Sequence, residues 1–289
     1  MRTVVITGAA GGFGRGLMSE LLERGDRVYA VVRGGAPRLR ALGEALLTRK
    51  LDAGLLTAID LDLRDFAAYP AAITAGGLSE VERIDVLFNI AGYAVFGPVA
   101  DVSLEELSDE FAVNVYSPVM LIQALLPALI RSRGRIINMG SLMGRLTFPL
   151  YGNYSASKHA LAALSEALAF ELAAHGVQVG LIEPSGYQTH FKKGIQFTAR
   201  SSGSRFAARV RQFRHVLEHE SDRYLGDPKE VVDLMLALCE VERLELRYPI
   251  GKSSGWLLLL KRVLPGGTFN RLVSGVFDAK VFRDHCVGV

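Results

Sequence analysis

Short apolar runs rich in β-branched residues alternate along this chain with longer stretches in which apolar residues recur every three or four positions. The first run extends from Arg2 to Thr7, and Leu17, Leu21 and Leu22 follow it at helical spacing, with Gly25 as a C-terminal cap. Short apolar runs predict buried strands, whereas the wider spacing predicts amphipathic helices. Because this alternation continues to Glu183, it predicts an α/β fold with a doubly wound parallel sheet.

A glycine cluster follows the first predicted strand. Gly8, Gly12 and Gly14 stand between the strand and the first predicted helix. Glycine lets the backbone approach a pyrophosphate closely, and the free amides at a helix N-terminus attract anions. The segment therefore predicts a dinucleotide site, although a glycine-rich turn of this spacing can also be purely structural.

Polar residues follow two further predicted strands. The run from Ile84 ends in Asn89-Ile-Ala-Gly92, and the run from Arg135 ends in Ser141. Ligands of an open parallel sheet bind outside the carboxyl ends of its strands. These residues are therefore expected at the functional edge, although each alone could equally cap a helix or fill a turn.

Tyr154 and Lys158 stand four residues apart in a segment whose alanines and leucines predict a helix, so their side chains share one face. A tyrosine titrates near ~10, and a neighbouring positive charge lowers its pKa toward the range useful for acid and base catalysis. The alternative for this pair alone is a surface tyrosine and a solvated lysine.

Together and in this order, these segments resemble the short-chain dehydrogenase/reductases, in the single-domain subgroup with a T-G-x-x-x-G-x-G turn and a Y-x-x-x-K pair. The resemblance covers residues 2–191, and the more variable tail is similar to those of hydroxysteroid and retinol dehydrogenases. It implies one Rossmann-type domain over residues 1–289, with a substrate lid at 190–225 and an apolar tail at 252–289. Two departures are Ile90, where many members carry asparagine, and Ser185, which replaces a glycine and affects the shape of its loop.

The resemblance also implies a catalytic tetrad of Asn114, Ser141, Tyr154 and Lys158. Tyr154 would exchange a proton with the substrate oxygen as hydride is transferred, and Ser141 would hydrogen-bond that oxygen. Lys158 would lower the tyrosine pKa and bind the nicotinamide ribose. Asn114 would hold a water that links the lysine to solvent. Alternatively, Asn114 bonds a neighbouring backbone group within the apolar helical segment 107–130.

The same resemblance assigns the cofactor site. Its expected residues are Thr7, Gly8, Gly12, Phe13, Gly14, Arg33, Asp62, Leu63, Asn89, Ala91, Gly92, Tyr154, Lys158, Pro184, Gly186, Tyr187 and Thr189. NADP(H) is favoured over NAD(H), because Val32 stands where an NAD enzyme usually has a carboxylate, and the following Arg33 can bind a 2′-phosphate, with Arg38 or Arg40 as helpers. A solvated arginine is the alternative, and Asp60 competes with Asp62 for the adenine contact.

The substrate side is marked by apolar and basic residues. The expected pocket wall is Tyr93, Leu142, Met143, Phe148, Pro149, Tyr187 and Phe191. Residues 190–217 contain no acid and seven cations, which could attract an anionic substrate or simply form the solvated face of a helix with an apolar stripe. The apolar tail from Trp256 suggests a lipophilic ketone or alcohol, but it could equally pack against a partner or touch a membrane surface.

Composition narrows the function classes. A chain of 289 residues with 49% hydrophobic residues can bury one large core, and a net charge of +3 argues against a nucleic-acid partner. Because the first predicted strand starts at Arg2, we expect no targeting peptide, and we expect no apolar run to reach transmembrane length. Two distant cysteines, Cys239 and Cys286, indicate neither a disulfide nor a metal site. We expect a cytoplasmic homodimer or homotetramer that acts on a small molecule and contains no metal.

Two function classes remain. The first is an NADP(H)-dependent oxidoreductase that interconverts a ketone or aldehyde and an alcohol, on a lipophilic substrate. The second is a non-catalytic NADP(H)-sensing protein on the same fold, since fold alone does not establish activity. The complete tetrad favours the enzyme. An epimerase or dehydratase relative would usually have a different glycine spacing and a larger substrate domain.

Overall fold

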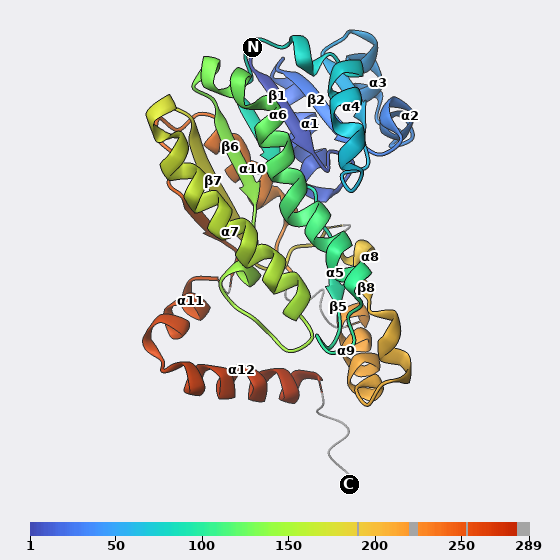
Figure 1. The fold of residues 1–289 in the computed structure, drawn as a ribbon, viewed down its shortest axis with the longest axis vertical. Helices are drawn as coiled ribbons and strands as arrows, with labels where there is room; N and C mark the ends of the chain where they lie inside the picture. The colour runs from blue at the N-terminus through green and yellow to red at the C-terminus, as the bar shows by residue number, and fades with distance from the viewer. Residues whose placement is uncertain (190, 220–224, 253, 282–289) are drawn as a thin grey trace.

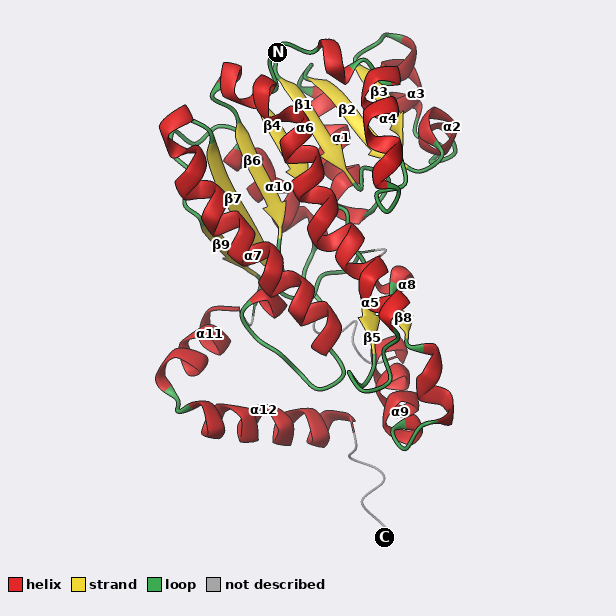
Figure 2. Ribbon diagram, in the orientation of Figure 1, coloured by secondary structure: helices red, strands yellow, loops and turns green. Residues whose placement is uncertain are grey.

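Seven parallel strands form the central sheet, in the order β3-β2-β1-β4-β6-β7-β9 (Figure 2). The computed structural model describes residues 1–189, 191–219, 225–252 and 254–281. The strands are β1 Thr3–Thr7, β2 Arg27–Val32, β3 Leu56–Asp60, β4 Val86–Asn89, β6 Arg135–Met139, β7 Gln178–Pro184 and β9 Arg247–Ile250. The chain runs outward from β1 to β3 and then returns to β4 on the other side of β1, so the topological switch point lies between β1 and β4.

Helices cover both faces of the sheet (Figure 1). They are α1 Gly12–Glu23, α2 Gly35–Arg40, α3 Ala45–Asp52, α4 Tyr69–Ala75, α5 Leu104–Phe111, α6 Ser117–Ser132, α7 Gly152–Leu172, α8 Phe191–Gly194, α9 Ala207–His219, α10 Pro228–Leu238, α11 Ser254–Val263 and α12 Gly266–Val281. A second, two-stranded sheet pairs β5 Val95–Phe96 with β8 Gln196–Phe197. The predicted doubly wound parallel fold in a single domain is confirmed.

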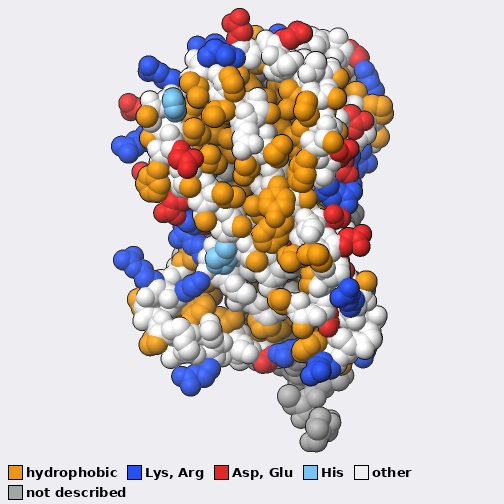
Figure 3. All heavy atoms as spheres, in the orientation of Figure 1, with side chains coloured by type: hydrophobic (Ala, Val, Ile, Leu, Met, Phe, Trp, Pro, Cys, Tyr) orange, Lys and Arg blue, Asp and Glu red, His pale blue; other side chains and the backbone are white. Residues whose placement is uncertain are grey.

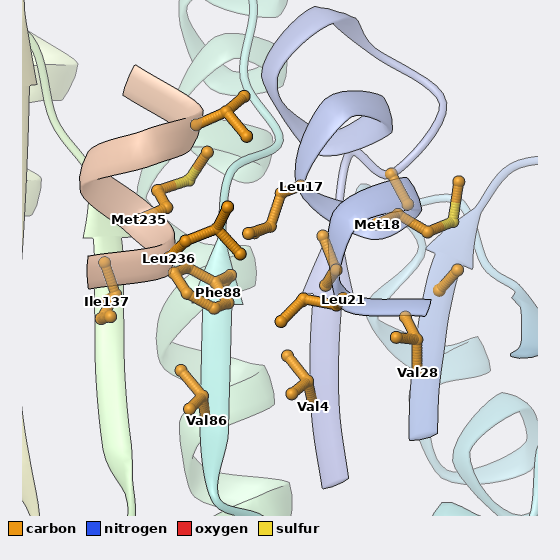
Figure 4. Close-up of a cluster of buried hydrophobic side chains, with 14 of the residues drawn as sticks. Val4, Leu17, Met18, Leu21, Val28, Val86, Phe88, Ile137, Met235 and Leu236 are labelled. Carbon is orange, nitrogen blue, oxygen red and sulfur yellow. The ribbon is translucent and has the colours of Figure 1, made fainter. Parts of the chain in front are cut away.

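The core has two layers because neighbouring strand residues point to opposite faces. On one face, Val86 and Phe88 of β4 pack with Leu17 of α1 and Met235 of α10 (Figure 4). On the other face, Leu87 belongs to a cluster with side chains of α4, α6 and α7. The sheet is therefore buried on both sides, which explains why its strands are almost continuously apolar.

The apolar segment 107–130 is not one uniform helix. Its helical region runs from α5 through a π-helical turn, Ala112–Tyr116, into α6. The expectation that no apolar run reaches transmembrane length was wrong by length and composition, because Leu104–Ser132 is a 29-residue helical stretch whose most apolar 18-residue window has a mean hydropathy of 1.7. Half of this window is buried within the fold, where Leu121, Leu125 and Leu129 of α6 pack in the cluster beneath the sheet.

The chain after β9 crosses the carboxyl edge of the sheet. The strands point toward the region bounded by α9, α11 and α12 (Figure 1). Apolar side chains of these three helices meet Tyr154 of α7 in a third buried cluster. The fold therefore builds an apolar compartment directly over the edge at which parallel sheets bind ligands.

Candidate active site

The turn after β1 has the backbone of an anion-binding site. Gly8 has a φ of +69°, which favours glycine, and a Cβ built on Gly14 would lie 2.3 Å from the carbonyl oxygen of Gly8. Helix α1 begins directly afterwards, with no side-chain cap and no acidic residue in its first turn. Its N-terminal amides and helix dipole therefore suit a phosphate group.

Thr7 joins this turn to the Asn-x-Ala-Gly segment. Its Oγ1 accepts hydrogen bonds from the backbone N–H groups of Ile90 at 3.0 Å and Ala91 at 3.1 Å. A Cβ on Gly8 would lie 2.9 Å from the backbone of Ala91. The two segments that were expected to bind the cofactor therefore pack together at the switch point.

Asn89 lies beneath this contact at the end of β4. Its Nδ2 donates to Asn138 Oδ1 at 2.8 Å, and Asn138 donates in turn to Ser165 Oγ at 2.9 Å. The buried Oδ1 of Asn89 has no hydrogen-bond partner among the described residues. A buried acceptor of this kind is costly, so the strand end can receive a donor from a bound group.

The loop after β7 reaches the glycine turn from the opposite side. Pro184 ends the strand, and the backbone N–H of Ser185 donates to the carbonyl of Ile250 at 2.9 Å, which fixes the loop where glycine was expected. A Cβ on Gly12 would lie 2.7 Å from Thr189 Cβ, so the loop touches the start of α1. Gly186 accepts from the N–H of Gly226 at 2.9 Å.

Tyr187 was expected both to bind the cofactor and to line the substrate pocket. The structure places it instead in the buried cluster of α1 and α10, with its ring 5.8 Å from that of Phe13 and its hydroxyl donating to Glu230 at 3.1 Å. Its side chain therefore belongs to a different buried cluster from that of Tyr154.

Arg33 directly follows β2, with 74% of its side chain exposed, and it lies 4.0 Å from Asp62. Asp62 accepts a shorter hydrogen bond from Arg64, 2.9 Å, and that contact holds the pKa of its carboxyl at about 2. Its rival Asp60 accepts from the backbone N–H of Gly34 at 2.7 Å and so fixes the turn after β2. Leu63 is buried beside Asp62. Of the two expected helpers, Arg38 is exposed and Arg40 pairs with Asp52.

Ser141, Tyr154 and Lys158 converge at the carboxyl end of β6. Tyr154 and Lys158 lie on the first turns of α7, with Lys158 Nζ 5.8 Å from the centre of the tyrosine ring. Lys158 donates to the carbonyl oxygen of Met139 at 2.8 Å. Ser141 Oγ accepts from the N–H of Met143 at 3.1 Å and also hydrogen-bonds with Tyr154. All three side chains are largely buried.

The protonation of this pair differs from the expectation. Burial raises the pKa of Tyr154 above its ordinary value, and the hydrogen bond from Ser141 only partly opposes that effect. Burial also lowers the pKa of Lys158 to about 8. The expected lowering of the tyrosine pKa is therefore absent here, because removal from water disfavours the charged phenolate.

Asn114 occupies the π-turn between α5 and α6 and is 1% exposed. Its Nδ2 donates to the carbonyl of Tyr93 at 2.9 Å and to Ser157 Oγ at 3.0 Å, while its Oδ1 accepts from the N–H of Tyr93 at 3.1 Å. A Cβ on Gly92 would lie 3.0 Å from this oxygen and 3.4 Å from Lys158 Nζ. Asn114 therefore lies close to Lys158, but its hydrogen bonds to the backbone are made with Tyr93, which is 21 residues away in the sequence.

Glu110 is a buried carboxylate that was not among the residues predicted from the sequence. It is fully buried, and its Oε2 accepts from the N–H of Val95 at 2.9 Å and from Asn153 at 2.7 Å, while Oε1 accepts from Ser157 at 3.3 Å. Burial raises its pKa to about 7, although these hydrogen bonds and the charge of Lys158 oppose the rise. The signal was present, since Glu110 stands four residues before Asn114 and so shares its helix face.

The expected pocket wall is largely assembled in the third cluster. Leu142, Met143, Phe148 and Phe191 all belong to the cluster of Tyr154, and the ring of Phe191 lies 5.8 Å from that of Tyr154. Further aromatic residues complete this wall, and they were not predicted to belong to it. They are Phe96, Tyr151, Phe197, Phe206, Phe213, Phe269 and Phe277. Phe96 of β5 lies 6.1 Å from the ring of Tyr154, and aromatic side chains of the lid and the tail belong to the same cluster.

The described basic side chains of residues 190–217 do not share one position relative to this cluster. Val210 and Phe213 of α9 face inward, whereas Arg211 and Arg214 are exposed. Arg209 pairs with Asp278 of α12. His190 and the side chains of Lys192 and Lys193 lie outside the described residues. Among the described residues, no group of three or more histidine, cysteine or acidic side chains could hold a metal ion.

The architecture and the sequence define one class of protein. The profile described as short chain dehydrogenase matches residues 2–199, more than half of the chain. This chain therefore belongs to the short-chain dehydrogenase family, whose members are oxidoreductases.

Particular relatives cover nearly all of its length. A Helicobacter pylori protein named "Probable short-chain type dehydrogenase/reductase VdlC" is 34% identical over 269 residues, which are 93% of this chain and 95% of the relative. Mouse 17-beta-hydroxysteroid dehydrogenase type 1 is 33% identical over 85% of this chain and 72% of its own. The crystal structure of a short-chain dehydrogenase from Streptomyces avermitilis has a TM-score of 0.77, 28% identity and 96% coverage of each chain.

Solved structures with this fold contain both forms of the nicotinamide nucleotide. A metagenomic short-chain oxidoreductase in complex with NADP is 28% identical, with a TM-score of 0.64 over 86% of this chain and 95% of its own. A 4-hydroxyisoleucine dehydrogenase complexed with NADH is 22% identical and so shows the fold alone. The comparisons support a nicotinamide nucleotide and leave the choice between its two forms to direct measurement.

Proposed function

We propose that this protein is an NADP(H)-dependent oxidoreductase that interconverts a lipophilic ketone or aldehyde and the corresponding alcohol. One observation carries the proposal: Ser141, Tyr154 and Lys158 converge at the carboxyl end of β6, and a largely aromatic cluster surrounds the phenol. A protein that only sensed the nucleotide would need neither the buried proton-active group nor the apolar compartment beside it.

The proton chemistry would belong to the side chains. Tyr154 holds the proton at its hydroxyl, because burial raises its pKa, and would donate it to the developing alkoxide. Ser141 would hydrogen-bond the same oxygen and fix its position beside the phenol. Lys158, whose pKa is about 8, can gain or lose a proton near neutral pH. Asn114 would position Lys158 and the turn at Gly92, and a water held there remains a prediction.

The nucleotide would occupy the switch point, where it supplies or accepts the hydride when bound. The glycine turn and the N-terminus of α1 would bind its phosphates, and Asp62 with Leu63 would contact the adenine. The segment 184–189 and Lys158 would contact its nicotinamide half. We favour NADP(H), because the exposed guanidinium of Arg33 directly follows β2, at the strand end where a carboxylate would repel a 2′-phosphate. The NADP-bound structural relative supports this choice.

The substrate class follows from the wall around Tyr154. Leu142, Met143, Phe148 and Phe191 present apolar surface to the phenol, and a buried apolar wall binds hydrocarbon far better than charge. The similarity to a hydroxysteroid dehydrogenase supports the same class. We propose residues 190–225 as the lid and residues 252–289 as the tail that closes the compartment, with residues 190, 220–224, 253 and 282–289 outside the described part.

Oxidation of NADPH and NADH, followed by absorbance with a panel of aliphatic, aromatic and steroid-like ketones, tests the proposal. We expect turnover with NADPH on lipophilic ketones and none in the variant Tyr154→Phe. The variant is a matched control because it removes one hydroxyl and keeps the ring. Tight NADPH binding without turnover on any substrate would instead favour the sensing protein.

We further propose a homodimer or homotetramer in the cytoplasm. Apolar side chains gather over α6 and α7 on one face of the molecule (Figure 3), where Leu164 and Phe170 are 38% and 74% exposed. An exposed apolar patch of this kind is typical of an association surface. The buried, unpaired thiol of Cys239 fits a reducing compartment, and Cys286 lies outside the described residues. Light scattering on the purified protein measures the assembly directly.

A further inference from the structure

The C-terminal helices carry an apolar stripe that the apolar compartment does not use. On α11, Trp256, Leu259 and Val263 are 60%, 60% and 62% exposed. Their spacing of three and four residues places them on one face of the helix. Neighbouring positions such as Leu257 and Leu260 pack inward with the cluster of Tyr154. The helix therefore has one apolar face turned to the core and another turned to solvent.

The charges around this stripe have a single sign. Residues 251–277 contain Lys252, Lys261, Arg262 and Arg271 but no aspartate or glutamate. Lys252, Arg262 and Arg271 are exposed, and Lys and Arg side chains lie around these helices in Figure 3. The first acidic residue, Asp278, pairs with Arg209 of the lid. The surface therefore combines exposed apolar side chains with uncompensated positive charge.

We propose that α11, extended by the exposed Leu272 and Val276 of α12, docks on a lipid bilayer that bears anionic headgroups. An amphipathic helix of this kind lies in the plane of the interface, with its apolar face inserted by ~5–10 Å and its cations among the headgroups. Trp256 has the side chain that is typical of such an interface. This proposal concerns binding only and does not depend on the proposed reaction.

Two other roles for the surface fit less well. A membrane-spanning helix needs roughly 20 residues, whereas α11 has 10 and α12 has 16, and the two are separated by Leu264 and Pro265. A second copy of this chain on the same face would oppose cations to cations, which disfavours association. An anionic bilayer satisfies both the apolar stripe and the charge.

Trp256 makes the test direct, because it is the only tryptophan in the chain. The full-length protein is mixed with vesicles of phosphatidylcholine containing phosphatidylglycerol and, separately, with vesicles of phosphatidylcholine alone. We expect a blue shift of tryptophan emission and co-sedimentation with the anionic vesicles, both weakened by added salt. Pure phosphatidylcholine should bind less protein.

The double variant Leu259→Glu, Val263→Glu retains Trp256 and should reduce the partition into anionic vesicles by about tenfold or more, since each buried methylene contributes about 0.8 kcal/mol. Leu104→Glu is the matched control, because Leu104 is 77% exposed on α5 and should leave vesicle binding unchanged. Circular dichroism confirms that the variants fold.

Unchanged emission and no co-sedimentation of the native chain would overturn the proposal. The proposal would also be overturned by self-association. In that case the tryptophan emission of the native protein would shift with protein concentration in the absence of vesicles, and the double variant would show no such shift.

Discussion

Replacement of Glu110 with glutamine should change how the stability of this protein depends on pH. Burial raises the pKa of this carboxyl from its ordinary value of 4.5 to about 7. A tenfold change in proton affinity corresponds to about 1.4 kcal/mol, so the folded chain holds the proton more tightly than the unfolded chain by about 3 kcal/mol. Below pH 4.5 both states are protonated at this residue. Between pH 4.5 and 7 only the folded state retains the proton.

The contribution of Glu110 to the free energy of unfolding is therefore fully present below pH 4.5 and is lost as the pH rises through 7. Glutamine cannot ionise, and its amide oxygen can still accept from the N–H of Val95 and from Asn153. We expect the difference in unfolding free energy between Glu110→Gln and the native protein to shift in favour of the variant by about 3 kcal/mol across this window.

Urea unfolding at a series of pH values between 4.5 and 8, followed by circular dichroism, measures this difference. Glu105→Gln serves as the control, because Glu105 is exposed on the same helix and its replacement should leave the pH dependence nearly unchanged. A constant difference between Glu110→Gln and the native protein over the whole range would refute the reasoning, because it would show that Glu110 ionises alike in both states.

Four further changes test other parts of the structure. Tyr154→Phe should lower kcat/KM by about a hundredfold or more while a fluorescence titration shows unchanged nucleotide affinity; retained turnover would remove the tyrosine from the chemistry. Arg33→Ala should raise the KM for NADPH by about tenfold with little effect on NADH, and an equal change for both would contradict its contact with the 2′-phosphate. Gly14→Ala places a Cβ 2.3 Å from the carbonyl oxygen of Gly8, so thermal melting with and without NADPH should show a less stable protein that nucleotide no longer stabilises. Phe88→Ala removes a fully buried ring and should lower the free energy of unfolding by about 3–5 kcal/mol in urea titrations, unless the core closes around the gap.

The fold could be predicted from the sequence because local patterns determine it. The strand at Thr3–Thr7, the glycine turn and Gly25, whose φ is +81° just beyond the C-cap of α1, follow from residues close together in the chain. The same applies to Tyr154 and Lys158, since helical spacing alone places them on one face. Agreement between these short-range signals made the doubly wound fold predictable.

Other features depend on contacts between distant segments. Tyr187 was expected to lie in the pocket because of its place after β7, yet its packing against Phe13 depends on how the loop meets α1. Phe96, Phe213 and Phe277 come from three separate segments of the chain, and only the complete fold brings them into one cluster with Tyr154. The direction of the tyrosine pKa depends on burial, which a spacing of four residues does not reveal.

The number of residues in the π-helical turn Ala112–Tyr116 determines the direction in which the Glu110 side chain points. An α-helix advances by about 100° per residue, so a wide turn with one extra residue rotates α5 by about that angle relative to α6. Helix α6 is fixed against the sheet through Leu121 and Leu125. A deletion of one residue within the turn would therefore leave the core in register and rotate Glu110 away from Asn153 and Ser157. At this position, adding or removing one residue rotates helix α5 relative to helix α6. The contacts of Glu110 can therefore change while the strands and helices of the fold keep their places.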